Sequence, residues 1–332
     1  ITGQDGSYLA DYLLKKNNLN VHGIIRHNSS MKNRSRIDHL FNHPKLTLHY
    51  GDITDYSVLN SIITKVRPEV IYNLAAQSHV RVSNLLPVLT TNINAVGCLN
   101  VLEIIKNFNK KIKFYQASTS ELYGIVSKNY QNEKTQFNPV SPYAISKLFS
   151  YHITIYYREA FGIYAVNGIL FNHESYRRGN NFVTKKIIEG AVKIKNNISH
   201  IIELGNIYAK RDWGYAPEYI EGLYKMMIQP IPDDYVLATG ESHTVKSFVD
   251  ETFKQLDIRI KWYLNGKKFY VKRMDNNKII LKSNTYFQRD IEVSHLKGDY
   301  NKALKILKWR PKVKFKKLIS IMLKDEIKNF TL

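Results

Sequence analysis

Short apolar runs alternate with longer amphipathic segments along the first half of the chain. The runs are rich in β-branched and aromatic side chains, which is typical of buried strands. They cover residues 21–26, 46–50, 70–76, 113–117 and 165–172. The segments between them predict helices, one ending near residue 16 and others at 55–65, about 88–106 and 143–161. This alternation predicts an α/β fold built on a doubly wound parallel sheet.

The pattern changes after Phe171. Residues 173–212 are rich in charge and amides, 213–239 predict a helix and then a strand, and 261–289 predict a strand-rich segment. Residues 301–309 and 316–330 predict two terminal helices. We therefore expect two lobes. The first takes residues 1–172 and a returning segment at about 213–250; a smaller, mixed lobe takes 173–212 and 251–332.

Composition narrows the class of protein. A chain of 332 residues can bury a large core, and its single cysteine, Cys98, excludes an internal disulfide and a cysteine-rich metal site. One buried cysteine favours a reducing, cytoplasmic setting. We found no run approaching the ~20 apolar residues of a membrane span and no signal-peptide pattern at the start. No metal site is predicted.

The net charge of +21 is large. Such a charge attracts phosphate groups, so nucleic acid is one candidate partner. The lysines are nevertheless spread along the chain, and no aromatic–basic nucleic-acid motif accompanies them. We therefore favour an anionic cofactor and a small anionic substrate over nucleic acid.

Two glycines near the start suggest where that cofactor binds. Gly3 and Gly6 precede a predicted helix, where glycine lets the backbone approach a pyrophosphate at the helix N-terminus. After the next strand, an NAD-binding chain usually carries an acid for the ribose hydroxyls, but this chain has Arg26, which suits a 2′-phosphate. Asp52, at the end of the following strand, is placed to meet the adenine edge. The predicted cofactor is NADP; a solvated surface arginine is the plain alternative for Arg26.

The stretch from Phe114 to Lys147 carries the candidate chemistry. Tyr143 and Lys147 are four apart on a predicted helix and so share one face. A phenol has a pKa of about 10, and lowering it by about three units takes about 4 kcal/mol. We expect the Lys147 ammonium and a bound nicotinamide cation to supply this. Glu121 follows the end of the strand before that helix, where such sheets bind ligands.

Several sequence blocks together resemble one family. They are Thr2-Gly-Gln-Asp-Gly-Ser-Tyr8, His49-Tyr-Gly-Asp52, Tyr72-Asn-Leu-Ala-Ala-Gln-Ser-His-Val80, Phe114-Tyr-Gln-Ala-Ser-Thr-Ser-Glu-Leu-Tyr-Gly124, Ser141-Pro-Tyr143, Val166-Asn-Gly-Ile-Leu-Phe-Asn-His-Glu-Ser175, Arg177-Arg-Gly179, Asn181-Phe-Val-Thr184, Lys210-Arg-Asp-Trp-Gly214 and Ala238-Thr-Gly-Glu241. With these blocks the chain resembles the extended short-chain dehydrogenase/reductase family and, within it, the GDP-mannose 4,6-dehydratases, over nearly its whole length.

The resemblance implies a Rossmann-type fold and a role for each matching residue. The implied catalytic residues are Thr119, Glu121, Tyr143 and Lys147. The implied cofactor contacts are Gly3, Gly6, Arg26, Asp52, Ile53, Leu74, Ala75, Ala76, Ser78, Lys147, His173 and Arg178. The residues implied to face the nucleotide sugar are Ser78, Thr119, Asn172, Asn181, Lys193, Arg211, Arg289 and Glu292.

The implied reaction is a dehydration of GDP-mannose that leaves NADP unchanged overall, which makes the enzyme a hydro-lyase. The family's loop around Arg26 and Arg36 reaches a neighbouring subunit's cofactor, which implies a homo-oligomer, either a dimer or a tetramer. Simpler interpretations stay open for three of these residues. His173 is then a structural histidine, and Arg211 and Arg289 form ordinary salt bridges. A different nucleotide-sugar epimerase or dehydratase is the enzyme alternative.

The start of the chain departs from the family. Ile1 stands inside the glycine-rich turn, where the family has a preceding buried strand and a further glycine. We expect the sheet to lack its first strand and the chain to be a fragment of a longer protein. An inactive, N-terminally truncated scaffold is the corresponding non-enzyme alternative.

Overall fold

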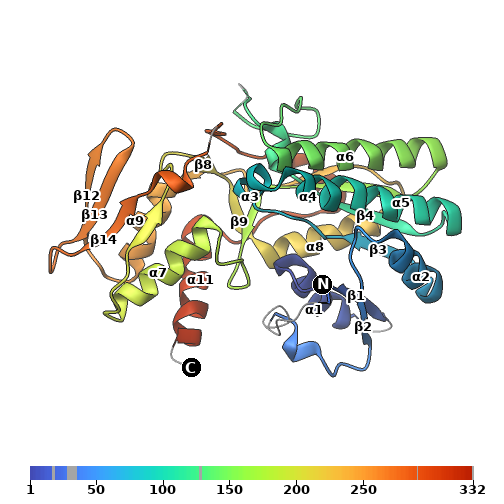
Figure 1. Cartoon of the computed structure of the whole chain (residues 1–332), viewed down its shortest axis with the longest axis horizontal. Coiled ribbons are helices and arrows are strands. Elements are labelled where there is room, and N and C mark those ends of the chain that lie inside the picture. The colour runs from blue at the N-terminus through green and yellow to red at the C-terminus, as the bar shows by residue number, and fades with distance from the viewer. Residues whose placement is uncertain (17–18, 28–35, 127–128, 290, 331–332) are drawn as a thin grey trace.

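The computed structural model describes residues 1–16, 19–27, 36–126, 129–289 and 291–330. Its centre is a parallel sheet in the order β10-β5-β4-β3 (Figure 1). These strands are β3 Val70–Asn73, β4 Lys113–Thr119, β5 Ala165–Leu170 and β10 Tyr235–Leu237. Every residue of β5 is buried, as expected of a strand covered on both faces. The prediction of a parallel sheet is confirmed.

Helices cover both faces of this sheet. On one face lie α2 Tyr56–Val66, α5 Gly97–Phe108 and α6 Pro142–Phe161, whose side chains form one apolar cluster with Phe114 and Ala165. On the other face lie α1 Gln4–Leu14, α8 Ala216–Met227 and α10 Asn301–Leu307, which pack around Tyr115 and Val166. Apolar burial against both faces is what stabilises the sheet.

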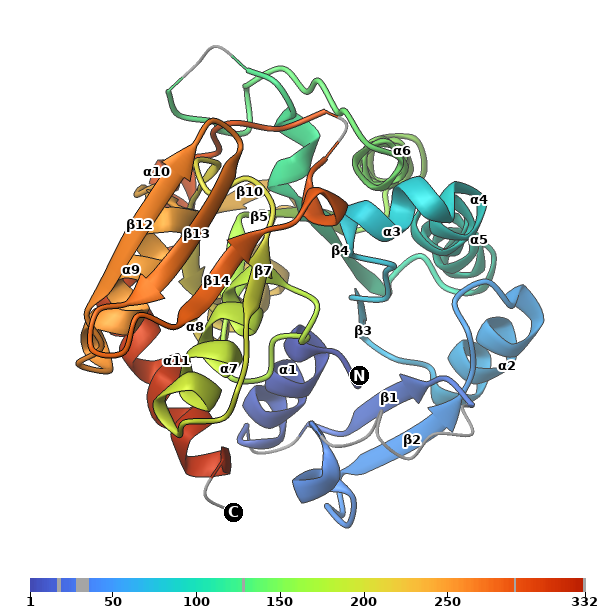
Figure 2. The same cartoon turned by 60° about the vertical axis from the view of Figure 1, so that its left-hand side comes forward.

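Strands β1 Val21–Ile25 and β2 Leu46–Tyr50 form a separate two-stranded parallel sheet. Within the described residues neither strand is hydrogen-bonded to β3, and Figure 2 shows the pair set apart from the central sheet. Residues of both β1 and β3 line one cavity. The parallel strands expected in one sheet therefore form two sheets, and the break lies between β1 and β3.

The second lobe packs around its own core. It contains a mixed sheet in the order β12-β13-β14-β7, seen at the left of Figure 1. Its elements are α7 Val183–Lys195, β7 Ile202–Leu204, α9 Val245–Gln255, β12 Ile260–Asn265, β13 Lys268–Arg273, β14 Ile279–Ser283 and α11 Phe315–Phe330. Trp213, Phe248 and Phe315 pack against one another inside this core.

Several short elements complete the fold, and some of them line the cavity described below. They are η2 Asp38–Leu40, α3 Val80–Leu85, α4 Pro87–Thr91, η3 Asn92–Val96, η4 Ser120–Tyr123, β6 Asn172–Glu174, β8 Lys210–Arg211, β9 Trp213–Tyr215, β11 His243–Thr244 and η5 Thr285–Phe287. The predicted helix at about 88–106 is thus one continuous run with a π-helical segment, η3, in its middle.

That run also corrects the expectation that no segment approaches a membrane span. By length and composition alone, Pro87–Phe108 could cross a membrane, with a mean hydropathy of 1.4. It passes this test because Glu103 and Lys106 are its only charged residues. Half of it is buried inside the protein, where Leu102 and Ile105 belong to the apolar cluster that α5 forms with α2 and α6. Such a test is also passed by a core helix, and core packing is what the structure shows for this one.

Candidate active site

A large cavity of about 1750 Å³ lies between the two lobes. Its floor is formed by the carboxyl ends of β3, β4 and β5, and the second lobe supplies residues from α7, β7 and the segment after β14. In open α/β sheets ligands bind at the carboxyl ends of the strands. The position of the cavity therefore agrees with the position expected for the candidate chemistry.

Local structure brings the four predicted catalytic residues to this edge. Thr119 is the last residue of β4, and its Oγ1 accepts a hydrogen bond from the Glu121 backbone N–H at 3.2 Å. On the other side, the Ser141 side chain caps α6 by accepting from the N–H of Ala144 at 3.1 Å. All four predicted residues, Thr119, Glu121, Tyr143 and Lys147, are buried and line the cavity.

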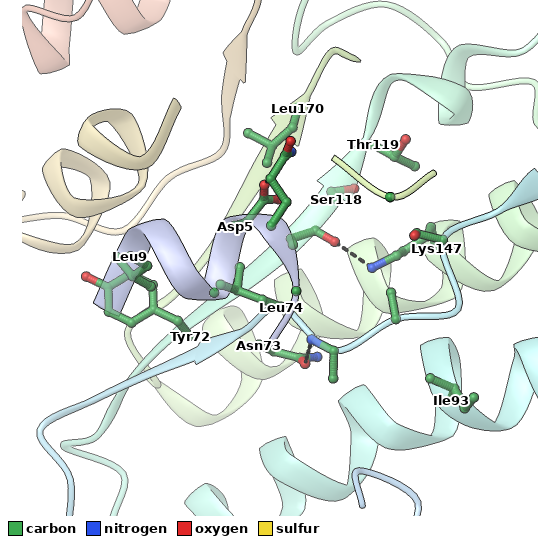
Figure 3. A pocket seen from close by; sticks show the side chains of 18 of the residues that line it. Asp5, Leu9, Tyr72, Asn73, Leu74, Ile93, Ser118, Thr119, Lys147 and Leu170 are labelled. Atoms are coloured by element: carbon green, nitrogen blue, oxygen red, sulfur yellow. Dashed lines mark hydrogen bonds between the residues drawn. The ribbon is translucent and has the colours of Figure 1, made fainter. Parts of the chain in front are cut away.

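Burial shifts the pKa values of both Tyr143 and Lys147. Burial raises the pKa of Tyr143 to about 12, and the charge of Glu121 adds to this, although a hydrogen bond with Thr119 opposes it. Burial likewise lowers the pKa of Lys147 to about 8. The Lys147 ammonium donates to the backbone oxygen of Ala117 at 2.8 Å (Figure 3). The expected lowering of the phenol pKa by Lys147 together with a nicotinamide cation stays a prediction; in the protein alone, desolvation of Tyr143 outweighs the groups that lower its pKa.

A buried polar network under Lys147 escaped the sequence analysis. Asn94, in the π-helical segment η3, donates to the backbone oxygen of Gln77 at 3.1 Å and to Ser146 Oγ at 3.1 Å. Its Oδ1 accepts from the N–H of Gln77 at 2.9 Å. Asn94 thus ties the segment after β3 to the turn of α6 that carries Lys147. The sequence did contain one signal for this network, an asparagine inside a predicted apolar helix. The π-helical segment that carries it is a second indication, because such segments often occur at functional sites.

The N-terminus of α1 faces the same cavity. Gly3 is its N-cap, and no side chain there accepts from the backbone N–H groups of the first turn. A Cβ on Gly6 would lie 2.7 Å from the backbone oxygen of Ile1, so only glycine fits there without a backbone shift. Gln4 Nε2 donates to the backbone oxygen of His173 at 3.1 Å, and Ser175 Oγ donates to Gln4 Oε1 at 2.8 Å. These bonds hold α1 against β6.

Asp5 and His173 form a partly buried ion pair beside that helix start. Asp5 Oδ2 lies 2.9 Å from His173 Nε2, and His173 Nδ1 lies 2.7 Å from the backbone oxygen of Phe171. Burial alone would raise the pKa of Asp5, but the charge and hydrogen bond of His173 outweigh it and lower that pKa to about 2. Burial would lower the pKa of His173, yet the charge of Asp5 raises it overall. The sequence analysis identified His173 but not Asp5.

Arg26 and Asp52 lie at the far end of the cavity, on the side of the β1–β2 sheet. Asp52 Oδ1 accepts from the N–H and Oγ1 of Thr54, at 2.9 and 2.7 Å. Burial acts to raise the pKa of Asp52, but these bonds and the charge of Arg26 lower it below its usual value. Arg36 donates within the chain, to the backbone oxygen of Arg177 at 2.7 Å. Residues 28–35 of the loop expected to reach a neighbouring subunit lie outside the described residues.

Two arginines come from the second lobe. Arg289 Nη1 lies 3.3 Å from Glu121 Oε2, and Arg211 Nη2 lies 3.3 Å from Glu292 Oε1. Arg211 also donates to the backbone oxygen of Val293 at 2.7 Å. Both arginines therefore form ion pairs, but their partners are themselves predicted site residues, and all four side chains line the cavity.

One predicted substrate residue, Lys193, is not among the residues that line the cavity. Lys186 lines it instead: its ammonium lies 3.3 Å from the centre of the Phe287 ring and 3.4 Å from the backbone oxygen of Glu203. The two lysines are seven residues apart on α7, so they share a face but lie about 10 Å apart along the helix. The remaining predicted site residues all line the cavity. They are Gly3, Gly6, Arg26, Asp52, Ile53, Leu74, Ala75, Ala76, Ser78, Thr119, Glu121, Tyr143, Lys147, Asn172, His173, Arg178, Asn181, Arg211, Arg289 and Glu292.

This lining suits a phosphate-bearing dinucleotide. The uncapped start of α1 offers backbone N–H groups and the positive end of the helix dipole to a phosphate. A Cβ added to Gly3 would meet no atom within 4 Å, so the backbone there is open to a ligand. Arg26 supplies positive charge at one end of the cavity, and Lys147 supplies a buried ammonium at the other.

Comparisons with known proteins agree with this geometry. A family model described as GDP-mannose 4,6 dehydratase matches residues 1–322. The chain is 49% identical to GDP-mannose 4,6 dehydratase of Drosophila melanogaster, over 98% of this chain and 84% of that protein. It is 44% identical to GDP-mannose 4,6-dehydratase of Vibrio cholerae, over 99% of this chain and 92% of that one.

Solved structures share the fold at low identity. The crystal structure of dTDP-glucose 4,6-dehydratase from Bacillus anthracis in complex with NAD superposes with a TM-score of 0.82 at 19% identity, covering 99% of this chain and 95% of that one. UDP-glucose 4-epimerase from Thermotoga maritima gives a TM-score of 0.80 at 22% identity, with coverage of 99% and 97%. At these identities the likeness concerns the fold alone.

Proposed function

The chain belongs to the GDP-mannose 4,6-dehydratase family, and on that premise we propose that it is a hydro-lyase that converts GDP-mannose to GDP-4-keto-6-deoxymannose. The observation that carries this proposal is the meeting of Thr119, Glu121, Tyr143 and Lys147 at one strand end. A phenol and a buried ammonium suit the oxidation of an alcohol. A carboxylate beside them suits the removal of a proton next to the resulting ketone and the protonation of a leaving hydroxyl.

We propose that the four side chains divide the proton transfers. Bound NADP would accept a hydride from carbon 4 of the sugar and return it to carbon 6, which leaves it unchanged overall. Tyr143 takes the proton of the 4-hydroxyl, which Thr119 also hydrogen-bonds, and Lys147 holds the nicotinamide ribose. Glu121 takes the proton from carbon 5 and passes it to the 6-hydroxyl, which leaves as water. Tyr143 then returns its proton to carbon 5.

The phenol requires help to act as a base. With a pKa of about 12 in the protein alone, Tyr143 is protonated at neutral pH. The positive charge of an oxidised nicotinamide beside it favours the phenolate. We propose that cofactor binding therefore precedes activation of Tyr143. The choice of NADP over NAD rests on Arg26, which lines the cavity where an acid would be needed for the ribose hydroxyls.

The proposed binding sites follow the two lobes. The proposed cofactor contacts lie mostly within residues 1–172, on α1, after β1 and β2, after β3 and on α6, and His173 and Arg178 add two contacts just beyond residue 172. The nucleotide sugar is held by Ser78, Asn172 and Asn181 together with the pairs Arg211–Glu292 and Glu121–Arg289, mainly from residues 173–212 and 251–332. The substrate-facing role of Lys193 stays a prediction, and we propose that Lys186, which lines the cavity, also faces the nucleotide sugar.

We also propose that the protein is a homo-oligomer. Helices α3 to α6 lie side by side at the top of Figure 1. They carry exposed apolar side chains at Leu85, Val88, Leu89, Ile145 and Phe149. Exposed apolar patches of this kind mark interaction sites. A cytoplasmic setting is proposed because the single cysteine, Cys98, is a buried free thiol, and neither nucleic acid nor a membrane is proposed as a partner.

Product analysis tests the function. Incubation of the purified protein with GDP-mannose and NADP should yield a GDP-4-keto-6-deoxy sugar without net accumulation of NADPH. Turnover of another nucleotide sugar, with no product from GDP-mannose, would favour an epimerase or a different dehydratase of the same fold. Glu121→Gln should still bind NADP but lose the dehydration, and full activity in that variant would remove Glu121 from the mechanism.

A further inference from the structure

The sheet formed by β12, β13 and β14 carries an excess of positive charge. Residues 260–283 contain six lysines and one arginine but a single acid, Asp275. Arg273 holds that acid at 2.5 Å, and Lys282 pairs with Glu203 of β7 at 3.1 Å. Within the described part of the chain the remaining lysines of this sheet form no ion pair. They are Lys261, Lys267, Lys268, Lys272 and Lys278.

The strand register gathers part of this charge on one face of the sheet. Lys261 lies directly opposite Lys272, and Tyr263 lies opposite Tyr270. The two phenol rings stack with their centres 4.7 Å apart, and the ammonium groups of Lys261 and Lys272 lie 5.6 and 5.7 Å from the centre of the Tyr263 ring. We call these four residues the basic face. Like charges directly opposite each other destabilise a sheet, so an anion bound on the basic face would stabilise it.

Strand β12 is the edge of its sheet. The order is β12-β13-β14-β7, and within the described residues no strand pairs with the other side of β12. An edge strand leaves every second backbone N–H and C=O without a partner in the sheet. On the side of β12 away from the basic face, Trp262 donates to Asp250 of α9 at 2.6 Å, and Leu264 is 49% exposed. An added strand would therefore meet free backbone groups, lysines on one face and an apolar side chain on the other.

Three kinds of partner can be compared on this chemistry. A second copy of the chain would bring its own lysines, and at a net charge of +21 two such edges repel each other. A nucleic acid would use the positive charge but neither the backbone edge nor Leu264. An extended protein segment in which acidic residues alternate with apolar ones would use all three features, because alternate side chains of a strand point to opposite faces. Charge complementarity and the free edge together favour that segment.

We propose that the free edge of β12, with the basic face beside it, is a docking site for such an acidic, extended segment of another protein. The segment adds a strand to the sheet through main-chain hydrogen bonds, and its carboxylates lie beside Lys261 and Lys272. The site lies at the opposite end of the molecule from α5 and α6 (Figure 1 and Figure 2). It is therefore separate from the apolar surface proposed for the homo-oligomer, and it does not depend on the proposed dehydration.

Fluorescence anisotropy of short labelled probes tests this docking site on the full chain. The main probe is a peptide of alternating glutamate and valine. A matched peptide carries an N-methyl group on every backbone nitrogen, which removes its hydrogen-bond donors and keeps its charge, so it should bind about tenfold more weakly or worse. Lys261→Glu combined with Lys272→Glu should also weaken binding of the main probe by about tenfold or more. The control, Lys134→Glu combined with Lys305→Glu, makes the same change in net charge at exposed lysines elsewhere and should bind within about twofold of wild type.

Four outcomes would overturn the inference. Equal binding of the two peptides would show attraction by charge alone. Tighter binding of an oligothymidylate of the same charge would make a nucleic acid the occupant. An unchanged affinity in the Lys261 and Lys272 variant would place the site elsewhere. No binding of the main probe would leave the lysines with the role of keeping the edge from pairing. If the double variant fails to fold, the comparison of the two peptides on wild type still decides.

Discussion

Replacing Asp5 with asparagine isolates the ion pair that joins α1 to β6. Asn has nearly the shape of Asp, so Asp5→Asn removes the charge and leaves the packing. The pair lies 2.9 Å apart, with side chains that are 24% exposed for Asp5 and 10% for His173. We expect the free energy of unfolding to fall while the fold is kept.

The size of the loss follows from the pKa of Asp5. That pKa is about 2 in the folded protein, against a usual 3.8. A shift of roughly two units corresponds to about 2 kcal/mol. Because the folded pKa is lowered, this stabilisation is full above pH 3.8 and is lost as the pH falls through about 2. The His173 pKa is raised, so its contribution is full below 6.5 and is lost as the pH rises through the folded value.

Urea unfolding of wild type and Asp5→Asn at pH 6 and pH 3 measures this effect. At pH 6 both contributions are full, and wild type should be more stable by about 2 kcal/mol; at pH 3 about half of the Asp5 contribution should remain. Titrating groups other than His173, whose raised pKa depends on Asp5, affect both proteins alike and cancel in the difference. The matched control Asp38→Asn changes an exposed carboxylate and should cost less than about 0.5 kcal/mol.

Two outcomes would refute the reasoning. One is an Asp5→Asn protein within about 0.5 kcal/mol of wild type at pH 6. The other is an Asp5 contribution that does not shrink between pH 6 and pH 3 after the separate titration of His173 in the two proteins is subtracted, since the linkage sign requires that contribution to shrink.

Three further changes test other parts of the structure. Gly6→Ala would place a Cβ 2.7 Å from the backbone oxygen of Ile1. The affinity for NADPH, measured by fluorescence, should therefore fall by about tenfold or more. An unchanged affinity would show that a side chain at residue 6 is compatible with cofactor binding. Asp212→Asn should lower the free energy of unfolding in urea by about 2–4 kcal/mol. The buried Asp212 carboxylate accepts four hydrogen bonds from Thr239, Gly240 and Gly298, and an amide cannot accept all of them. A decrease below about 1 kcal/mol would count against this role of Asp212. Phe149→Asp places a charge on the exposed apolar surface of α3 to α6 and should give a monomer in sedimentation equilibrium, and an oligomer of unchanged size would place the interface elsewhere.

The local structure of the chain could be predicted from its sequence. Apolar runs of strand length and amphipathic helical segments depend on spacings of two and of three to four residues, which are visible in the sequence. The expected helix at 143–161 is therefore close to the observed α6, Pro142–Phe161, with Ser141 as its cap. For the same reason the sequence alone was enough to assign Tyr143 and Lys147 to one face of that helix.

Which residues meet across the cavity was decided by the tertiary structure. Asp5 and His173 are 168 residues apart in sequence, as are Glu121 and Arg289, and no periodicity pairs them. Lys186 and Lys193 occupy the same face of α7, and only the packing of the lobes determines which of the two reaches the cavity. The pKa of Tyr143 likewise depends on how much of the phenol is buried. A sequence specifies chemical groups and local geometry, whereas desolvation and long-range ion pairing arise when distant segments pack together.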